Sequence, residues 1–139
     1  MKLPELQIGM SASVRKVITK EDTALNFGSG ALNNLLATPT LAALMIEASV
    51  KLIDPLLPEG YITIGKTLEI EHENPTIEGV TVTVTAKLLE VNGSKLSLEI
   101  LAADEIGRIG TGYHERFIVA HSLLMDKVRE RFSVIESRP

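Results

Sequence analysis

The segment from Thr38 to Ile53 constrains the fold more than any other, because it is apolar on nearly every side when wound as a helix. Thr38 can cap the first turn with its hydroxyl, and Pro39 suits the first helical position. Thr40, Glu47 and Lys51 form a narrow polar stripe. Such a helix is buried, and in a chain of 139 residues this requires a sheet wrapped around it or a second subunit over it.

Beyond Gly60 the pattern changes to the alternation of apolar and polar residues that is typical of strands. Asn92-Gly93 is a strong signal for a two-residue hairpin. We expect strands over residues 6–18, 61–73, 80–91, 95–103 and 108–120, a polar loop over 19–34, and an amphipathic helix over 122–135. One face of the second strand is expected to carry Ile62, Ile64, Leu68, Ile70 and His72.

Four of these strands follow one another as expected hairpins, with the buried helix placed before them. This order predicts an α+β fold in which an antiparallel sheet packs against one long helix. A sheet wrapped around one central helix, here followed by a C-terminal helix, is the hotdog fold, and we expect residues 1–139 to form a single domain of this kind. Pairing of sheet edges between subunits would remove an exposed edge strand. We therefore expect a homodimer, or a dimer of such dimers.

Composition excludes several classes of function. The net charge is −4 and no basic run exceeds two residues, which disfavours a nucleic-acid or membrane partner. The chain has no cysteine, and its three histidines stand at no metal-ligand spacing, so we expect no metal site. We find neither the apolar core of a signal peptide nor an apolar run long enough to span a bilayer, and we expect a soluble, cytoplasmic protein.

Three segments together resemble the fluoroacetyl-CoA thioesterase-like family. The first runs from Asp22 through Ala-Thr-Pro39 and is followed by Leu44-Met45, as in the lead-in and central helix of the family. The second comprises Gly65, His72 and Gly79-Val-Thr-Val-Thr-Val84, and the third is Gly110-Thr-Gly-Tyr-His-Glu-Arg116. The resemblance implies hydrolysis of acyl-CoA thioesters at a site between two subunits. Coenzyme A would be part of the substrate, and no separate cofactor is expected.

By the same resemblance, Thr38 and His72 fall on the family's catalytic threonine and histidine, and Gly65 on a glycine whose backbone lines the site. The family's glutamate falls on Ile46, and Glu47 follows one residue later, which is a rotation of about 100° on a helix. Either the helix adjusts to bring Glu47 in, or the site lacks the carboxylate. Arg116 is a candidate for binding a carboxylate or a phosphate of coenzyme A.

The fluoroacetyl-specific member of the family has phenylalanines in the lead-in loop that gate its pocket, and by the resemblance Ser29 and Leu32 stand at their positions here. We therefore expect short- to medium-chain acyl groups rather than fluoroacetyl as the substrate.

Each candidate also has a simpler interpretation. Thr38 could act only as a helix cap, His72 could be a hydrogen-bonded core residue, and Glu47 could pair with Lys51 across one helical turn. The displaced glutamate keeps open an alternative function, a hotdog domain that binds an acyl-CoA or a similar ligand without hydrolysing it. A purely structural dimerisation domain is a third possibility. Against these, the start of a buried helix offers free N–H groups to a developing oxyanion, and a histidine can serve as the base.

Overall fold

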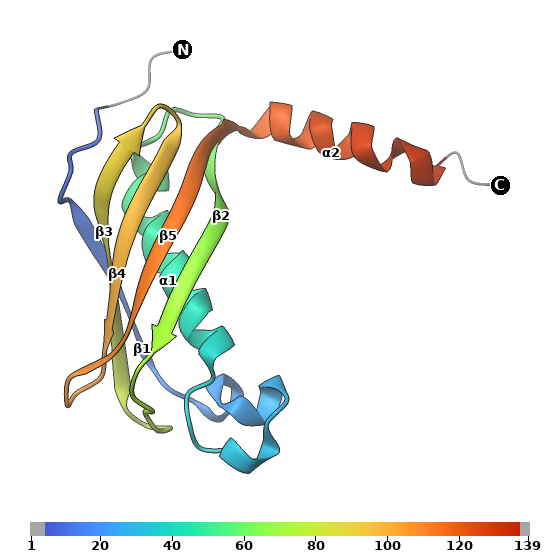
Figure 1. Cartoon of the computed structure of the whole chain (residues 1–139). Helices are drawn as coiled ribbons and strands as arrows, with labels where there is room; N and C mark the ends of the chain where they lie inside the picture. The colour runs from blue at the N-terminus through green and yellow to red at the C-terminus, as the bar shows by residue number, and fades with distance from the viewer. Residues whose placement is uncertain (1–4, 137–139) are drawn as a thin grey trace.

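The computed structural model describes residues 5–136 and shows a five-stranded antiparallel sheet curled around one long helix (Figure 1). The elements in chain order are β1 (Ser11–Val17), α1 (Thr38–Ile53), β2 (Tyr61–His72), β3 (Thr81–Asn92), β4 (Lys95–Ala103), β5 (Arg108–Ala120) and α2 (His121–Glu136). Short 3₁₀ turns occupy Lys20–Asp22, Ala24–Phe27 and Gly30–Leu32 in the loop before α1, and a fourth, Asp54–Leu56, follows α1. The predicted α+β class and the limits of α1 are confirmed.

The strand order is β1-β3-β4-β5-β2, which differs from the expected succession of hairpins at one point. β2 does not pair with β3. It pairs with β5, and β3 pairs with β1. The reason lies in the connection over residues 73–80, which bonds to the loop before α1 instead of turning back: the N–H of Leu36 donates to the carbonyl of Thr76 at 2.9 Å. As a result β1 and β2 are the two open edges of the sheet.

The core lies between α1 and the concave face of the sheet. Leu41, Met45 and Ala48 of α1 are fully buried there. Two glycines of β5 allow this close packing: a Cβ added at Gly110 would lie 2.7 Å from the carbonyl oxygen of Glu71, and one at Gly112 would lie 2.8 Å from the sulfur of Met45. A side chain at either position would push the helix or the edge strand away.

The opposite side of α1 is not covered within one chain. Ala43 and Glu47 are exposed, and Ile46 is 40% exposed. The sheet of one chain therefore buries only one side of α1, whereas the apolar sequence predicts burial on nearly every side. The C-terminal helix α2 projects from the end of β5 and contains no buried residue (Figure 1).

A β-bulge in β2 changes which residues face the helix. The register with β5 shifts between Gly65 and Thr67, so one face of the strand is exchanged for the other. Leu68 and Ile70 lie opposite His114 and Gly112, and His72 lies opposite Gly110, all on the helix side as predicted. The prediction for Ile62 and Ile64 is wrong: before the bulge it is Thr63 and Gly65 that share the inner side with Arg116.

Candidate active site

The first turn of α1 meets the end of β2 through two polar side chains. The hydroxyl of Thr38 lies 2.8 Å from Nδ1 of His72. The helix begins at Thr38, and the cap position is taken by Ala37, whose extended backbone precedes the first turn. The prediction that Thr38 caps the helix is therefore wrong, since its hydroxyl turns sideways to the strand instead.

The two ring nitrogens of His72 have different surroundings. Nδ1 faces the hydroxyl of Thr38, whereas Nε2 is buried and has no hydrogen-bond partner among residues 5–136. Burial lowers the pKa of His72 below its ordinary value, so the imidazole is neutral at neutral pH. A neutral imidazole offers one proton and one lone pair. The Thr38–His72 pair can therefore withdraw a proton from a hydroxyl or a water molecule and return it to a leaving group.

An apolar cavity opens beside this pair. It has a volume of about 270 Å³ and is lined by Ala24, Leu32, Leu35, Leu36, Ala37, Thr38, His72 and Pro75. The positive end of the α1 dipole points at the same place, and the first N–H groups of a helix have no partner within it. A larger hollow of about 550 Å³ lies elsewhere, with Glu69, Glu71 and Glu99 in its lining, and adjoins neither Thr38 nor His72.

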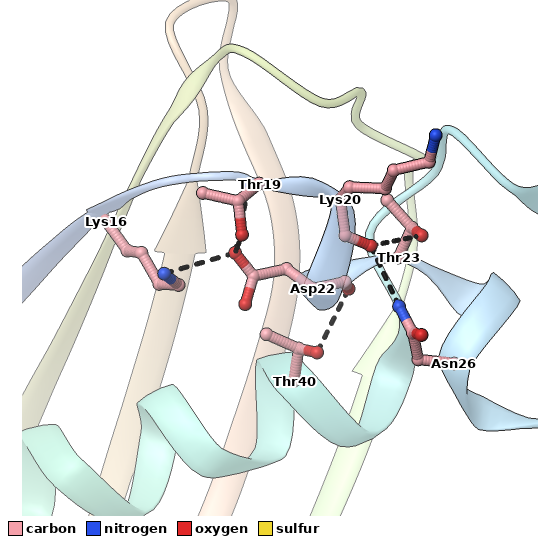
Figure 2. Close-up of polar contacts among 7 residues, drawn as sticks. All are labelled: Lys16, Thr19, Lys20, Asp22, Thr23, Asn26 and Thr40. Atoms are coloured by element: carbon pink, nitrogen blue, oxygen red, sulfur yellow. Dashed lines mark hydrogen bonds and ion pairs between the residues drawn. The ribbon is translucent and has the colours of Figure 1, made fainter.

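The loop that forms one wall of the cavity is fastened to α1 through Asp22 (Figure 2). Its carboxylate accepts hydrogen bonds from the N–H and the hydroxyl of Thr19 at 2.8 and 3.0 Å and pairs with Lys16 at 3.2 Å. Its backbone carbonyl accepts a bond from the hydroxyl of Thr40 at 3.0 Å. Burial acts to raise the pKa of Asp22, but the bonds from Thr19 and Lys16 outweigh it and the pKa is lowered. The loop is thus tied to the helix start that carries Thr38.

A second polar group surrounds Gly65, at the other end of β2. Arg116 is 5% exposed, and its Nε and Nη2 donate to the hydroxyl and the carbonyl of Thr63, both at 2.8 Å. The hydroxyl of Thr63 donates in turn to Asp54 at 2.6 Å. A Cβ added at Gly65 would lie 3.1 Å from Nη1 of Arg116 and 3.3 Å from Nε2 of His114. Both atoms therefore reach the strand surface only because residue 65 is a glycine.

Comparison with known proteins assigns the chain to a family. Residues 18–122 match the fluoroacetyl-CoA-specific thioesterase family. The chain belongs to this family. It is therefore an acyl-CoA thioesterase, and the enzyme class predicted from the three sequence segments is confirmed.

Individual relatives agree with this assignment. The fluoroacetyl-CoA thioesterase of Streptantibioticus cattleyicolor is 36% identical over 97 residues, 70% of each chain. A hot-dog-like protein from Thermanaerovibrio acidaminovorans superposes with a TM-score of 0.86 at 32% identity, over 90% of this chain and 92% of that one. A threonine-to-serine variant of a fluoroacetyl-CoA thioesterase in complex with acetyl-CoA superposes with a TM-score of 0.84 at 29% identity, over 91% and 98% of the two chains. The predicted hotdog fold is confirmed.

The third predicted catalytic residue, Glu47, stays apart from the Thr38–His72 pair. It is exposed and makes no hydrogen bond or ion pair with any described residue. Lys51 donates to the carbonyl of Ser13 at 2.7 Å, so the simple Glu47–Lys51 pair does not form either. Along the helix axis Glu47 lies about 13 Å beyond Thr38. Within one chain the carboxylate does not join the Thr38–His72 pair.

The two polar groups of the thioesterase are likewise far apart in one chain. Gly65 and His72 are separated by seven residues of β2, which at about 3.3 Å per residue is roughly 20 Å. The sequence reasoning placed Gly65 and Arg116 with Thr38 and His72, and the structure does not bring them together in one subunit. It also adds Thr63, which the alternation of β2 could not identify because the bulge after Gly65 was not visible in the sequence. His114 lies beside this group, on the same side of β5 as Arg116, as the alternation of that strand indicates.

Across residues 5–136 the structure contains no group of three histidine, cysteine or acidic residues placed to hold a metal ion. None of the described helices is long and apolar enough to cross a membrane.

Proposed function

We propose that this thioesterase hydrolyses short- to medium-chain aliphatic acyl-CoA thioesters as a cytoplasmic homodimer, at a site completed by both subunits. Thr38 and His72 would carry the reaction, and Gly65 and Arg116 would bind substrate. The observation that carries the proposal is the 2.8 Å contact between the Thr38 hydroxyl and His72 Nδ1 at the edge of an apolar cavity.

The dimer is argued from two uncovered surfaces. β2 is an open edge of the sheet, and its free N–H and C=O groups can pair with a second β2. The exposed side of α1, with Ala43 and the 40% exposed Ile46, would be covered at the same time. Antiparallel pairing of two β2 strands brings the Gly65 end of one toward the His72 end of the other. The two polar groups that lie roughly 20 Å apart in one chain would then face a common substrate.

The reaction follows from the groups around Thr38. His72 Nδ1 takes the hydroxyl proton while the Thr38 oxygen attacks the thioester carbonyl. The negative charge that develops on the carbonyl oxygen is stabilised by the N–H groups and the positive dipole end of α1, a contribution of about 3 kcal/mol for a preorganised donor. Collapse of the intermediate breaks the C–S bond, and the imidazolium returns its proton to the coenzyme A sulfur. Attack of water on the acyl-threonine, with His72 again as base, releases the carboxylic acid.

The acyl group is inferred from the cavity. Its lining beside Thr38 and His72 consists of leucine, alanine and proline side chains without an aromatic ring. At roughly 30 Å³ for each water-sized group, a cavity of about 270 Å³ holds up to about nine heavy atoms. This suits an aliphatic chain better than the small, polar fluoroacetyl group.

Release of free thiol from a series of acyl-CoA substrates tests the proposal. We expect hydrolysis with a maximum at short to medium chain length, no strong preference for fluoroacetyl over acetyl, and loss of activity in Thr38→Ala. A hundredfold preference for fluoroacetyl-CoA would contradict the assignment of the cavity. A stable monomer at micromolar concentration, measured by light scattering, would contradict the shared site.

The replacement of the family glutamate by Ile46 favours one competing function, binding of an acyl-CoA without hydrolysis. Calorimetric binding of acyl-CoA in the absence of any thiol release would support that alternative instead.

A further inference from the structure

The C-terminal helix α2 has a mixed apolar and basic side that its own chain leaves open. Residues that recur at spacings of three and four, and so lie on one side of the helix, are Leu124, Lys127, Val128, Arg131, Phe132 and Ile135. We call this side the α2 stripe. Its Val128, Phe132 and Ile135 are 39%, 44% and 43% exposed. The opposite side of the helix is polar and contains the Arg129–Asp126 ion pair. Such a division is typical of a helix whose apolar side packs against another surface.

The direction of α2 indicates which surface this is. The helix leaves the end of β5 beside the start of β2, where the N–H of His121 donates to the carbonyl of Gly60 at 2.8 Å. From there it runs crosswise to the strands and beyond β2 (Figure 1). β2 is the edge that pairs with a second β2 in the proposed dimer. α2 therefore extends past that edge to the place of the second subunit.

The start of α2 lies on the outer, convex side of the sheet. Leu124 and Lys127 border a hollow together with Ile64. Ile64 belongs to the outer face of β2, because Thr63 and Gly65 on either side of it share the inner side with Arg116. The helix has 16 residues, and at 1.5 Å per residue it spans about 24 Å, which is about five strand spacings of 4.8 Å. It is long enough to cross most of the outer face of a second sheet.

The pairing of β2 determines which part of that face α2 meets. When two whole β2 strands pair antiparallel, the Tyr61 end of one lies beside the His72 end of the other. α2 starts at the Tyr61 end, so it crosses the second sheet at the level of Glu71. At this level Glu71, Thr111 and Leu101 are neighbours on β2, β5 and β4. Leu101 is 46% exposed.

This part of the outer face complements the α2 stripe in charge and polarity. It contains the hollow of about 550 Å³, whose lining includes Glu69, Glu71, Glu99, Leu89 and Tyr113. None of the three carboxylates forms an ion pair with any of residues 5–136. Lys127 and Arg131 of the stripe likewise have no ion-pair partner in that part of the chain. Carboxylates around apolar side chains thus match cations among apolar side chains.

We propose that the α2 stripe of each subunit packs across the outer face of the other subunit's sheet, with Lys127 beside Glu69 and Glu71 and the apolar residues over the hollow. The inference rests on the proposed function for the pairing of β2 strands, and it adds a second, separate contact between the same two chains. In a two-fold symmetric dimer this contact occurs twice. It holds together the β2 pairing that joins the two halves of each active site.

Engineered cysteines test the contact directly, because the chain contains none of its own. Lys127→Cys combined with Glu69→Cys or Glu71→Cys should give a covalent dimer after mild oxidation, seen on a non-reducing gel, since a disulfide needs Cα atoms within about 7 Å. Within one chain α2 starts beside Tyr61, at least eight residues of β2 away, which is roughly 26 Å. The disulfide can therefore form only between subunits. Lys127→Cys combined with Arg15→Cys, on the far edge strand β1, is the matched control and should give no covalent dimer, as should each single cysteine.

A pair of aspartate variants measures the contribution of the stripe to dimerisation. Phe132→Asp and Ser133→Asp place the same carboxylate at adjacent positions of α2, but only Phe132 belongs to the stripe. In Phe132→Asp the dissociation constant of the dimer, measured by sedimentation equilibrium, should rise about tenfold or more, as expected when a large apolar side chain is no longer buried. The specific activity should then fall on dilution and recover at high protein concentration. Ser133→Asp should behave like the wild type in both measurements.

The outcomes separate this inference from the proposed function. Failure of both cysteine pairs to cross-link, or a Phe132→Asp dimer as tight as the wild type, overturns the α2 contact and leaves thioester hydrolysis at a β2-paired dimer standing. Cross-linking of a protein that hydrolyses no acyl-CoA would support the contact and refute the proposed function. Binding of the wild type to vesicles of anionic phospholipid, lost in Phe132→Asp while dimerisation is unchanged, would overturn the contact by showing that the stripe binds a membrane surface instead.

Discussion

The two ends of β2 carry polar groups of opposite character. At the His72 end, a single contact of 2.8 Å joins two side chains, Thr38 is exposed, and the buried Nε2 of His72 has no partner among the described residues. At the Gly65 end, Arg116 is enclosed and bonded twice to Thr63, which is bonded in turn to Asp54. A neutral imidazole that contacts one hydroxyl suits proton transfer, whereas a guanidinium held by two hydrogen bonds suits positioning. Substitutions at the first end should therefore change rate, and those at the second should also change stability.

The largest effect is expected for His72→Ala. Removing a general acid–base group lowers kcat by about 10²–10⁴-fold, while the half-buried position at the end of a strand makes the loss of stability small. Turnover of a short acyl-CoA and the midpoint of urea unfolding, measured on the same preparation, test both parts. Retention of full activity would show that the reaction does not depend on the Thr38–His72 pair.

Arg116→Met should show the reverse of His72→Ala, with a large loss of stability. The substitution removes both bonds to Thr63 and leaves Asp54 without the cation nearby, and breaking a buried charged network costs about 3 kcal/mol. Urea unfolding should report this loss directly. A variant as stable as the wild type would show that Arg116 is held for the substrate alone, and the contrast between the two ends of β2 would not hold.

The Gly65 end should also make the protein sensitive to acid. Burial and the neighbouring Arg116 lower the pKa of His114 from its ordinary value of 6.5 to about 4. Between these values the unfolded chain binds a proton that the native state does not, so stability is complete above pH 6.5 and falls by about 3 kcal/mol as the pH drops toward 4. In His114→Gln this contribution should be absent, leaving only the weaker dependence due to His72, whose pKa is also lowered by burial. Equal slopes of unfolding free energy against pH in the two proteins would contradict it.

The smallest effect is expected for Glu47→Gln, if each active site is assembled without this carboxylate. Glu47 is exposed and makes no hydrogen bond or ion pair within the described chain, so kcat should change by less than about twofold and stability by a few tenths of a kcal/mol. A fall in kcat comparable to that of His72→Ala would instead show that Glu47 reaches a substrate across the dimer. The pair of variants thus decides whether Glu47 takes part in catalysis.

Much of the fold could be predicted because it depends on local patterns. The apolar helix from Thr38 to Ile53 has the observed limits, and the predicted β3–β4 hairpin forms, with its turn at Gly93-Ser94, one residue later than predicted. The position of β2 could not be predicted, because it depends on residues 73–80 bonding to the loop before α1 instead of forming a hairpin. Nor could the inward turn of Thr63 and Gly65, because the bulge after Gly65 exchanges the two faces of a strand whose pattern reads continuously.

The sequence by itself determined the central helix, most of the strands and the family, since these depend on residue type and spacing. Tertiary structure alone decided that the Thr38 hydroxyl turns to His72 instead of capping the helix, that Arg116 is enclosed by Thr63 and Asp54, and that Ser49 orients His114. These are contacts between residues distant in the chain, at distances of about 3 Å. Hydrogen bonds of that length depend on the relative placement of packed elements, which no local pattern of residues specifies.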